Sequence, residues 1–209
     1  MRTLKEGLQQ LAHLGLRVFL KIHCGLRVHG IPRLDRPSLL VANHASHIDI
    51  AALFAALPIS EVTKVRTAAA RDTIYALPKP LIAAVEFFFN TYPFERKGGS
   101  SDSLARGAEC LRQGYHLAIF PEGRRSTDGS FLGFTPGFAK IAYQTGAPVV
   151  PVRIQGAHRT MPRGQKYIQR LPMEVTFSEP VEADTTIPFE ERREAYAGLI
   201  RRAELAFHN

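Results

Sequence analysis

Segment 43–49 of the chain, which reads Asn-His-Ala-Ser-His-Ile-Asp, carries the side chains best suited to proton transfer. An imidazole titrates near neutral pH, so His44 could remove a proton from a hydroxyl group. If the residues after His44 form the first turns of a helix, Asp49 could turn back, orient the ring and stabilise its protonated form. The pair predicts a general base that needs no serine nucleophile. Because a histidine and an aspartate at this spacing can occur by chance, the pair alone is a weak signal, and a structural histidine is the alternative.

A metal site is the other chemistry that this segment suggests, since His44, His47 and Asp49 all carry ligand atoms. No further ligand clusters nearby, so we expect no metal, and we expect His47 to pack or hydrogen-bond locally. The two cysteines, Cys24 and Cys110, form no CxxC pair and no zinc-type spacing. They predict neither a disulfide framework nor a structural metal, and they favour a reducing compartment.

Two basic segments follow apolar runs further along the chain. Segment 120–126 reads Phe-Pro-Glu-Gly-Arg-Arg-Ser, and segment 92–98 reads Tyr-Pro-Phe-Glu-Arg-Lys-Gly. Gly123 would let a ligand approach the backbone closely, and Arg124 and Arg125 could hold a phosphate through forked hydrogen bonds. Each segment could instead be a solvated charged turn.

The elements that must position these residues alternate between strand-like and helix-like runs, which is typical of an α/β domain. We expect a single domain with a mixed, largely parallel central sheet flanked by helices. Polar motifs that begin where strands end predict a site at the strand ends. The expected strands are 38–42, 62–69, 86–92, 116–120, 148–154 and 173–177. The expected helices are 50–57, one from 78 or 80 to 84, 101–112, one from 135 or 136, and 189–207.

An amphipathic helix over residues 2–22 is predicted to precede this domain, so the chain divides into 1–25 and 26–209. One arc of the helix is apolar and the opposite face is mostly basic. The helix could dock on the core or lie on an anionic lipid surface, and both could hold at once. The apolar arc consists of Leu4, Leu8, Leu11, Gly15, Val18 and Ile22.

The composition limits the possible partners. The 209 residues have 45% hydrophobic content, a formal net charge of +8 and a sequence pI near 9.8, so the chain should be drawn to anions. A nucleic-acid partner is not expected, because no basic helix with interleaved aromatic residues is present. No stretch approaches the length of a bilayer span, so we expect peripheral attachment at the cytoplasmic face of a membrane.

These segments resemble, in content and order, four sequence blocks of the 1-acylglycerol-3-phosphate acyltransferases and their glycerolipid acyltransferase relatives. Four blocks in the same order are very rarely a coincidence, and together they span more than half of the chain. The matching residues are Asn43-His44 with Asp49, then Phe94-Glu95-Arg96, then Phe120 to Ser126, and finally Val149-Val150-Pro151-Val152.

The resemblance implies direct transfer of a fatty acyl group from acyl-CoA or acyl carrier protein to a lysophospholipid hydroxyl, without a cofactor. It makes His44 the general base and Asp49 its partner. The implied acceptor is 1-acylglycerol-3-phosphate, which would give phosphatidic acid. Another lysophospholipid, a lyso-aminolipid, or a non-catalytic lipid-binding role are the alternatives. The implied substrate-binding residues are Arg96, Glu122, Gly123, Arg124, Arg125 and Ser126, of which Arg96 and Arg125 would hold the acceptor phosphate and Glu122 would fix loop geometry.

Two departures from the family pattern bear on the acceptor. Arg124 stands where a threonine is usual, which adds a positive charge beside Arg125. Many members carry Phe-Lys-Lys-Gly where this chain has Phe134-Thr135-Pro136-Gly137, and Lys140 could substitute in part for the missing lysines. Neither change touches His44 or Asp49.

Overall fold

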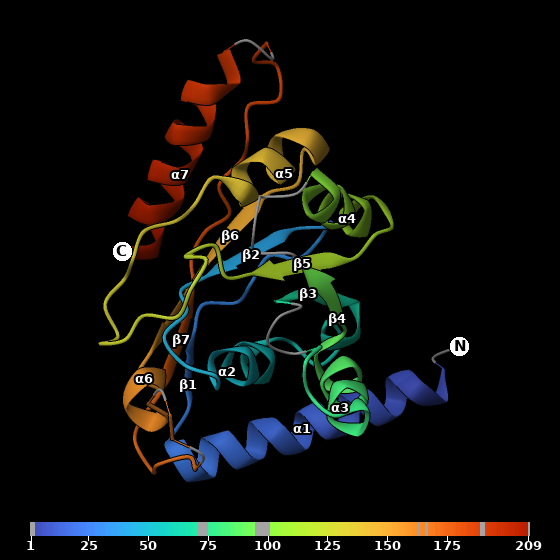
Figure 1. Cartoon of the computed structure of the whole chain (residues 1–209), viewed down its shortest axis with the longest axis vertical. Helices are drawn as coiled ribbons and strands as arrows, with labels where there is room; N and C mark the ends of the chain where they lie inside the picture. Colours follow the sequence, from blue (N-terminus) through green and yellow to red (C-terminus); the bar gives the residue numbers. More distant parts are fainter. Residues whose placement is uncertain are drawn as a thin grey trace.

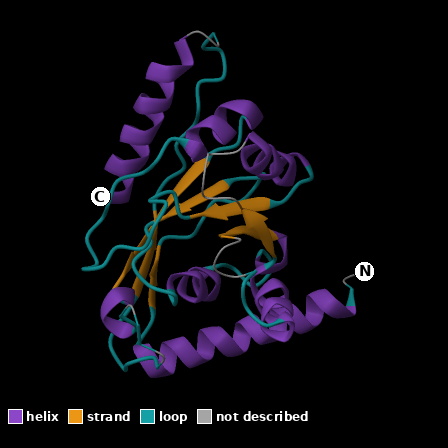
Figure 2. Ribbon diagram, in the orientation of Figure 1, coloured by secondary structure: helices purple, strands orange, loops and turns teal. Residues whose placement is uncertain are grey.

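The computed structural model of the chain describes residues 3–70, 75–94, 101–162, 164–165, 167–188 and 191–208. These residues form a three-layer α/β domain around a twisted sheet with the strand order β1-β7-β6-β2-β5-β3-β4 (Figures 1 and 2). Neighbouring strands are parallel except β6 and β7. The predicted mixed, largely parallel sheet is therefore confirmed. The strands are β1 (Arg27–His29), β2 (Leu39–Ala42), β3 (Val65–Ala70), β4 (Thr91–Phe94), β5 (His116–Ile119), β6 (Val149–Gln155) and β7 (Glu174–Phe177).

Helices cover both faces of the sheet, with α1, α2 and α3 on one side and α4, α5 and α7 on the other (Figure 1). Strand β2 separates the two cores, because its side chains alternate between the faces. Leu40 and Ala42 belong to the core under α2, whereas Leu39 and Val41 belong to the core under α5. The helices are α1 (Leu4–Cys24), α2 (Asp49–Ala56), α3 (Lys79–Phe89), α4 (Ser101–Arg112), α5 (Gly137–Thr145), α6 (Ala157–Thr160) and α7 (Arg192–His208), with a 3₁₀ turn, η1, at Val62–Lys64.

Helix α3 differs most from the sequence prediction. Residues 86–89, which were expected to begin a strand, form its last turn, and the strand starts only at Thr91. Asn90 separates the two elements in the left-handed conformation (φ 46°). A continuous apolar run does not distinguish a helix from a buried strand by periodicity, which is why the prediction of a strand was wrong. The short elements β1 and α6 were not predicted.

Helix α1 is amphipathic, and the side that packs against the domain is polar along much of its length and apolar at Leu20 and Cys24. The Gln9 side chain donates to the Phe87 carbonyl at 2.6 Å, and the Arg17 guanidinium donates to the Ala55 and Leu57 carbonyls at the end of α2. The His13 ring stacks on Phe54 with 5.2 Å between centroids. The hydrophobic arc of α1 consequently faces outward.

The exposed side chains of this arc form a row along α1. Leu4 is 83% exposed, Leu11 66% and Ile22 72%. A capping box of Thr3 and Glu6 begins the helix. Within the described residues no helix is both long enough and apolar enough to cross a membrane.

Candidate active site

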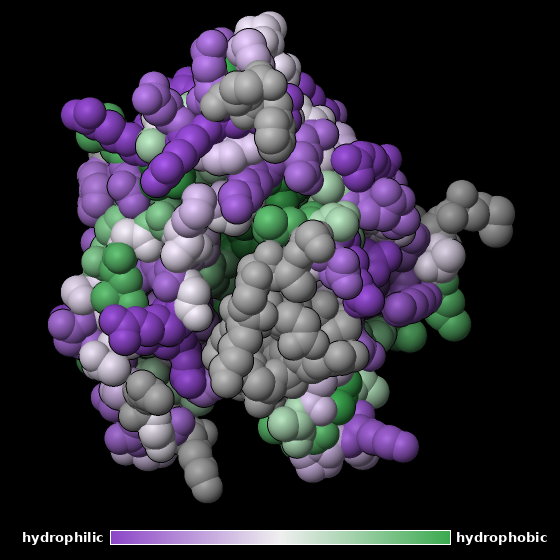
Figure 3. All heavy atoms as spheres, turned by 45° about the horizontal axis from the view of Figure 1, so that its top comes forward, coloured by the Kyte–Doolittle hydropathy of each residue, from purple (hydrophilic) through white to green (hydrophobic). Residues whose placement is uncertain are grey.

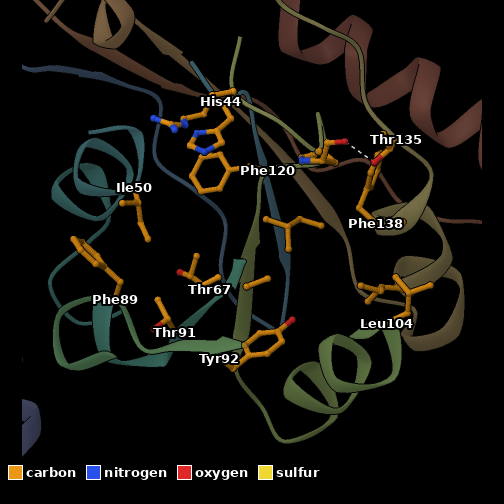
Figure 4. A pocket seen from close by; sticks show the side chains of 18 of the residues that line it. His44, Ile50, Thr67, Phe89, Thr91, Tyr92, Leu104, Phe120, Thr135 and Phe138 are labelled. Carbon is orange, nitrogen blue, oxygen red and sulfur yellow. Dashed lines mark hydrogen bonds between the residues drawn. The ribbon is translucent and has the colours of Figure 1, made fainter. Parts of the chain in front are cut away.

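The candidate site lies where the parallel strands β2, β5 and β3 end, at one edge of the sheet. Segment 43–49 follows β2 and segment 120–126 follows β5. Because parallel strands run in one direction, the segments that follow them meet at the same edge. The close-up in Figure 4 shows His44 above Phe120, with Thr67 of β3 and Tyr92 of β4 further along the same cavity.

His44 and Asp49 are hydrogen-bonded to each other. His44 Nδ1 lies 2.9 Å from Asp49 Oδ2. The backbone amides of Ala45 and Ser46 also donate to Oδ2, each at 2.7 Å. Asp49 is completely buried in the first turn of α2, where negative charge is favoured by the helix dipole. Because an ionised carboxylate only accepts hydrogen bonds, Nδ1 must carry the proton, and Nε2 is left as the basic nitrogen.

The orientation of His44 is fixed by contacts on its backbone as well as on its ring. The Glu122 carboxylate accepts hydrogen bonds from the His44 amide at 2.6 Å and from the Leu132 amide at 2.9 Å. The Ser126 amide donates to the His44 carbonyl at 2.9 Å. Burial raises the pKa of Glu122, and the hydrogen bonds from the two amides oppose that shift. Glu122 and Ser126 therefore hold the loop after β5 against the loop that carries His44.

Asn43 supports the same loop from the other neighbour of β2. Its side chain donates to the Ile154 carbonyl at 2.9 Å and accepts from the Ile154 amide at 2.7 Å. A side-chain amide thus makes the pair of bonds that another strand residue would make with β6. The sequence analysis gave Asn43 no role, although an asparagine directly after a buried strand is able to pair in this way.

A cavity of about 340 Å³ opens at His44. It lies between residues that pack against the core under α2 and residues that pack against the core under α5. Most of its lining is apolar. On the face shown in Figure 3, hydrophobic side chains gather in a hollow near the centre, and mostly hydrophilic ones lie above it in the view. The lining residues include His44, His47, Ile50, Thr67, Val85, Phe89, Tyr92, Leu104, Phe120, Gly123, Arg125, Thr135, Phe138 and Ile141.

The predicted substrate-binding residues occupy different positions around this cavity. Gly123 and Arg125 line it, and Gly123 has a positive φ of 72° that suits a glycine. Arg124 is exposed and is not among the lining residues, and neither is Lys140. Glu122 and Ser126 act through the backbone of His44. Arg96 lies outside the described residues.

His47 was given only a local packing role by the sequence analysis, yet its side chain is exposed and lines the cavity. Its position in the sequence does not indicate this place, because residues 44–48 form a turn that precedes α2. No cluster of three or more potential metal-ligating side chains occurs in the part of the chain that the structure describes.

Comparison with known proteins places the chain in a family. Residues 25–155 match the family model described as Acyltransferase. The chain belongs to the acyltransferase family, in the branch that contains the 1-acylglycerol-3-phosphate acyltransferases, as the sequence blocks predicted.

Individual relatives support this placement. The chain is 32% identical to the chloroplastic 1-acyl-sn-glycerol-3-phosphate acyltransferase BAT2 of Brassica napus, over 68% of this chain and 39% of the relative. It is 29% identical to the 1-acyl-sn-glycerol-3-phosphate acyltransferase of Cocos nucifera, over 76% of this chain and 50% of the relative. The matches to these plant proteins thus span two-fifths to one-half of their length.

A solved structure covers more of the chain. The crystal structure of the 1-acyl-sn-glycerophosphate (LPA) acyltransferase PlsC from Thermotoga maritima matches with a TM-score of 0.68 and 26% sequence identity. The match covers 97% of this chain and 82% of that one.

Proposed function

We propose that this protein transfers a fatty acyl group from a thioester to the free hydroxyl of a lysophospholipid, with 1-acylglycerol-3-phosphate as the acceptor. The observation that carries the proposal is the 2.9 Å contact between His44 and Asp49 at the opening of an apolar cavity. The relatives named above, which are described as 1-acyl-sn-glycerol-3-phosphate acyltransferases, support the choice of acceptor.

The proposed reaction is a single transfer within a ternary complex. His44 Nε2 removes the proton of the acceptor hydroxyl as its oxygen attacks the thioester carbonyl carbon. The carbon–sulfur bond of the resulting tetrahedral intermediate then breaks, and the imidazolium returns the proton to the leaving sulfur. The buried Asp49 carboxylate stabilises the imidazolium between these two steps. No metal or cofactor takes part in this scheme.

The apolar cavity would hold an acyl chain. Phe138 of α5, Leu104 of α4 and Phe89 of α3 present hydrocarbon surface to it from three helices (Figure 4). Each methylene moved from water into such surroundings contributes about 0.8 kcal/mol. The donor would be acyl-CoA or acyl carrier protein, since both present the chain as a thioester.

The acceptor phosphate would lie on the basic side of the opening. Arg125 lines the cavity beside Gly123, and a guanidinium can bind a phosphate through two parallel hydrogen bonds. The exposed Arg124 would add positive charge around the opening, and the role expected for Arg96 remains part of the proposal.

Attachment to a membrane would occur through α1. The hydrophobic arc of this helix faces away from the domain, where it could enter the boundary between headgroups and acyl chains. The net charge of +8 would favour an anionic bilayer. We propose peripheral attachment at the cytoplasmic face, where the lysolipid and both thioester donors would be within reach.

The first test is thiol release from palmitoyl-CoA, with 1-acylglycerol-3-phosphate and a panel of other lysophospholipids and lyso-aminolipids. The native protein would be compared with His44→Ala and with His29→Ala, a control histidine exposed on β1. Release that requires both an acceptor and His44 supports the proposal and identifies the acceptor. No release with any acceptor, with carrier-protein thioesters included, would favour a non-catalytic lipid-binding role.

A further inference from the structure

His47 lies at the opening of the cavity. It lies in the turn between His44 and helix α2, its side chain is exposed, and it lines the cavity. The ring makes no hydrogen bond within the described part of the chain. A polar side chain that lines a ligand cavity and has no bond of its own is available to the ligand.

The charges around His47 come from two loops. Arg125 faces it from the loop after β5, and His44 and Asp49 face it from its own segment. Burial, Arg125 and His44 lower the pKa of His47, and Asp49 opposes them with a smaller effect. The lowered pKa favours the neutral ring at neutral pH, and Arg125 contributes to this shift.

Few of the described side chains that line the cavity are basic and could bind an anion. Among the described lining residues the basic side chains are His44, His47 and Arg125. His44 is held by Asp49 and is assigned to proton transfer. The other two, Arg125 and His47, both line the opening and carry groups that can donate hydrogen bonds to an anion.

We propose that His47 and Arg125 together bind the phosphate of the acceptor, and that His47 takes up a proton when this phosphate arrives. The inference rests on the proposed function, because it assumes that the acceptor carries a phosphate. A phosphate monoester has a second pKa near 6 and so brings close to two negative charges at neutral pH. These charges reverse the balance around His47, since they outweigh the single charge of Arg125.

The protonated ring can then donate a hydrogen bond to a phosphate oxygen. A bond between two charged groups is stronger and shorter than one between neutral groups. A phosphodiester headgroup carries only one negative charge and would draw the proton less strongly. His47 thereby makes the site selective for a phosphate monoester over the diester headgroups of other lysophospholipids.

Proton uptake by His47 makes the affinity for the acceptor depend on pH. Binding of the acceptor raises the pKa of His47, so the added affinity is fully present below the pKa of the free ring. It is lost as the pH rises through the pKa of the bound ring. Turnover at saturating acceptor should not share this dependence, because His47 does not touch the transferred proton.

The kinetic test compares KM and kcat for 1-acylglycerol-3-phosphate between pH 5.5 and 8.5 in native protein and in His47→Gln, His47→Arg and the control His29→Gln. We expect the ratio of KM in His47→Gln to native KM to be about ten at low pH, as for loss of one charged hydrogen bond, and to approach one at high pH. His47→Arg, with a permanent charge, should keep a low KM at every pH. Titration of the free acceptor is the same for all four proteins.

A second measurement does not depend on turnover. The pKa of the His47 ring, followed by NMR of histidine-labelled protein, should rise when glycerol 3-phosphate or 1-acylglycerol-3-phosphate is added. An unchanged pKa, a KM ratio that is constant with pH, or a parallel fall of kcat would each overturn the inference. Absence of turnover with this acceptor in native protein would instead count against the proposed function, and the NMR measurement would still decide the role of His47.

Discussion

Replacement of Asp49 by asparagine tests how far the His44–Asp49 pair carries catalysis. The side chain keeps its size but loses the charge that faces the imidazolium. With an effective dielectric constant near 20, two unit charges 2.9 Å apart attract by about 6 kcal/mol. Each 1.4 kcal/mol corresponds to about a factor of ten in rate, so this attraction sets an upper limit near 10⁴. We expect kcat to fall by about 10³-fold to 10⁴-fold.

The assay is thiol release at saturating donor and acceptor, because the effect should appear in kcat. Asp49→Asn should remain folded but lose some stability, since its new amide group would occupy the buried position of Oδ1, which has no hydrogen-bond partner in the described structure. An unpaired buried polar group costs about 1–3 kcal/mol. Asp184→Asn, at an exposed turn, is the matched control. A folded Asp49→Asn protein with more than a tenth of native kcat would refute the assigned role of the pair.

Three further predictions concern attachment, pH and the loop after β2. Leu11→Glu combined with Ile22→Glu should weaken binding to anionic vesicles by at least about tenfold, measured by cosedimentation, because both side chains belong to the exposed arc of α1. Burial lowers the pKa of His13, so the free energy of unfolding in urea should decrease as the pH falls from 6.5 through the lower pKa of the folded protein, and His13→Phe should reduce that decrease. Asn43→Ala should lower the free energy of unfolding by about 2–4 kcal/mol, because it leaves both backbone groups of Ile154 without their partner.

Each of these predictions has a control and an outcome that would contradict it. The double variant on α1 should keep its melting temperature, and unchanged vesicle binding would show that the arc is not the attachment surface. An equal pH dependence in His13→Phe and native protein would assign the effect to other groups. A loss below about 0.5 kcal/mol in Asn43→Ala would mean that water replaces the side-chain amide without cost.

The sequence predicted the contact between His44 and Asp49 and the sheet because their signals are local. The strand at 39–42 is a short apolar run that is followed by Asn43, and the turn that brings Asp49 to His44 needs only the four residues between them. The helical form of residues 86–89 could not be predicted in the same way. That apolar run fits a helix or a strand equally well, and contacts with α1, far away in the chain, accompany the helix.

The orientation of α1 and the position of His47 depend on three-dimensional contacts that sequence spacing does not reveal. The amphipathic pattern of α1 predicted a helix with one hydrophobic side, but which side meets the domain depends on partners such as the Ala55 carbonyl that Arg17 reaches. In the same way, the place of His47 beside Arg125 depends on how the loop after β5 folds over the turn. Sequence spacing alone does not bring these two loops together.

The hydrogen bonds from Arg17 to the end of α2 have a consequence for how a lipid reaches the reaction centre. Arg17 lies on α1 and binds the last carbonyls of α2, while Asp49 begins α2 at its other end. The two contacts are separated by the length of an eight-residue helix, about 12 Å. If α1 lies in the headgroup layer, the reaction centre is held at a fixed offset from the anchoring helix. How far an acceptor must rise from its leaflet would then be set by this rigid spacer, so turnover would respond to how tightly the surrounding lipids are packed as well as to acceptor concentration.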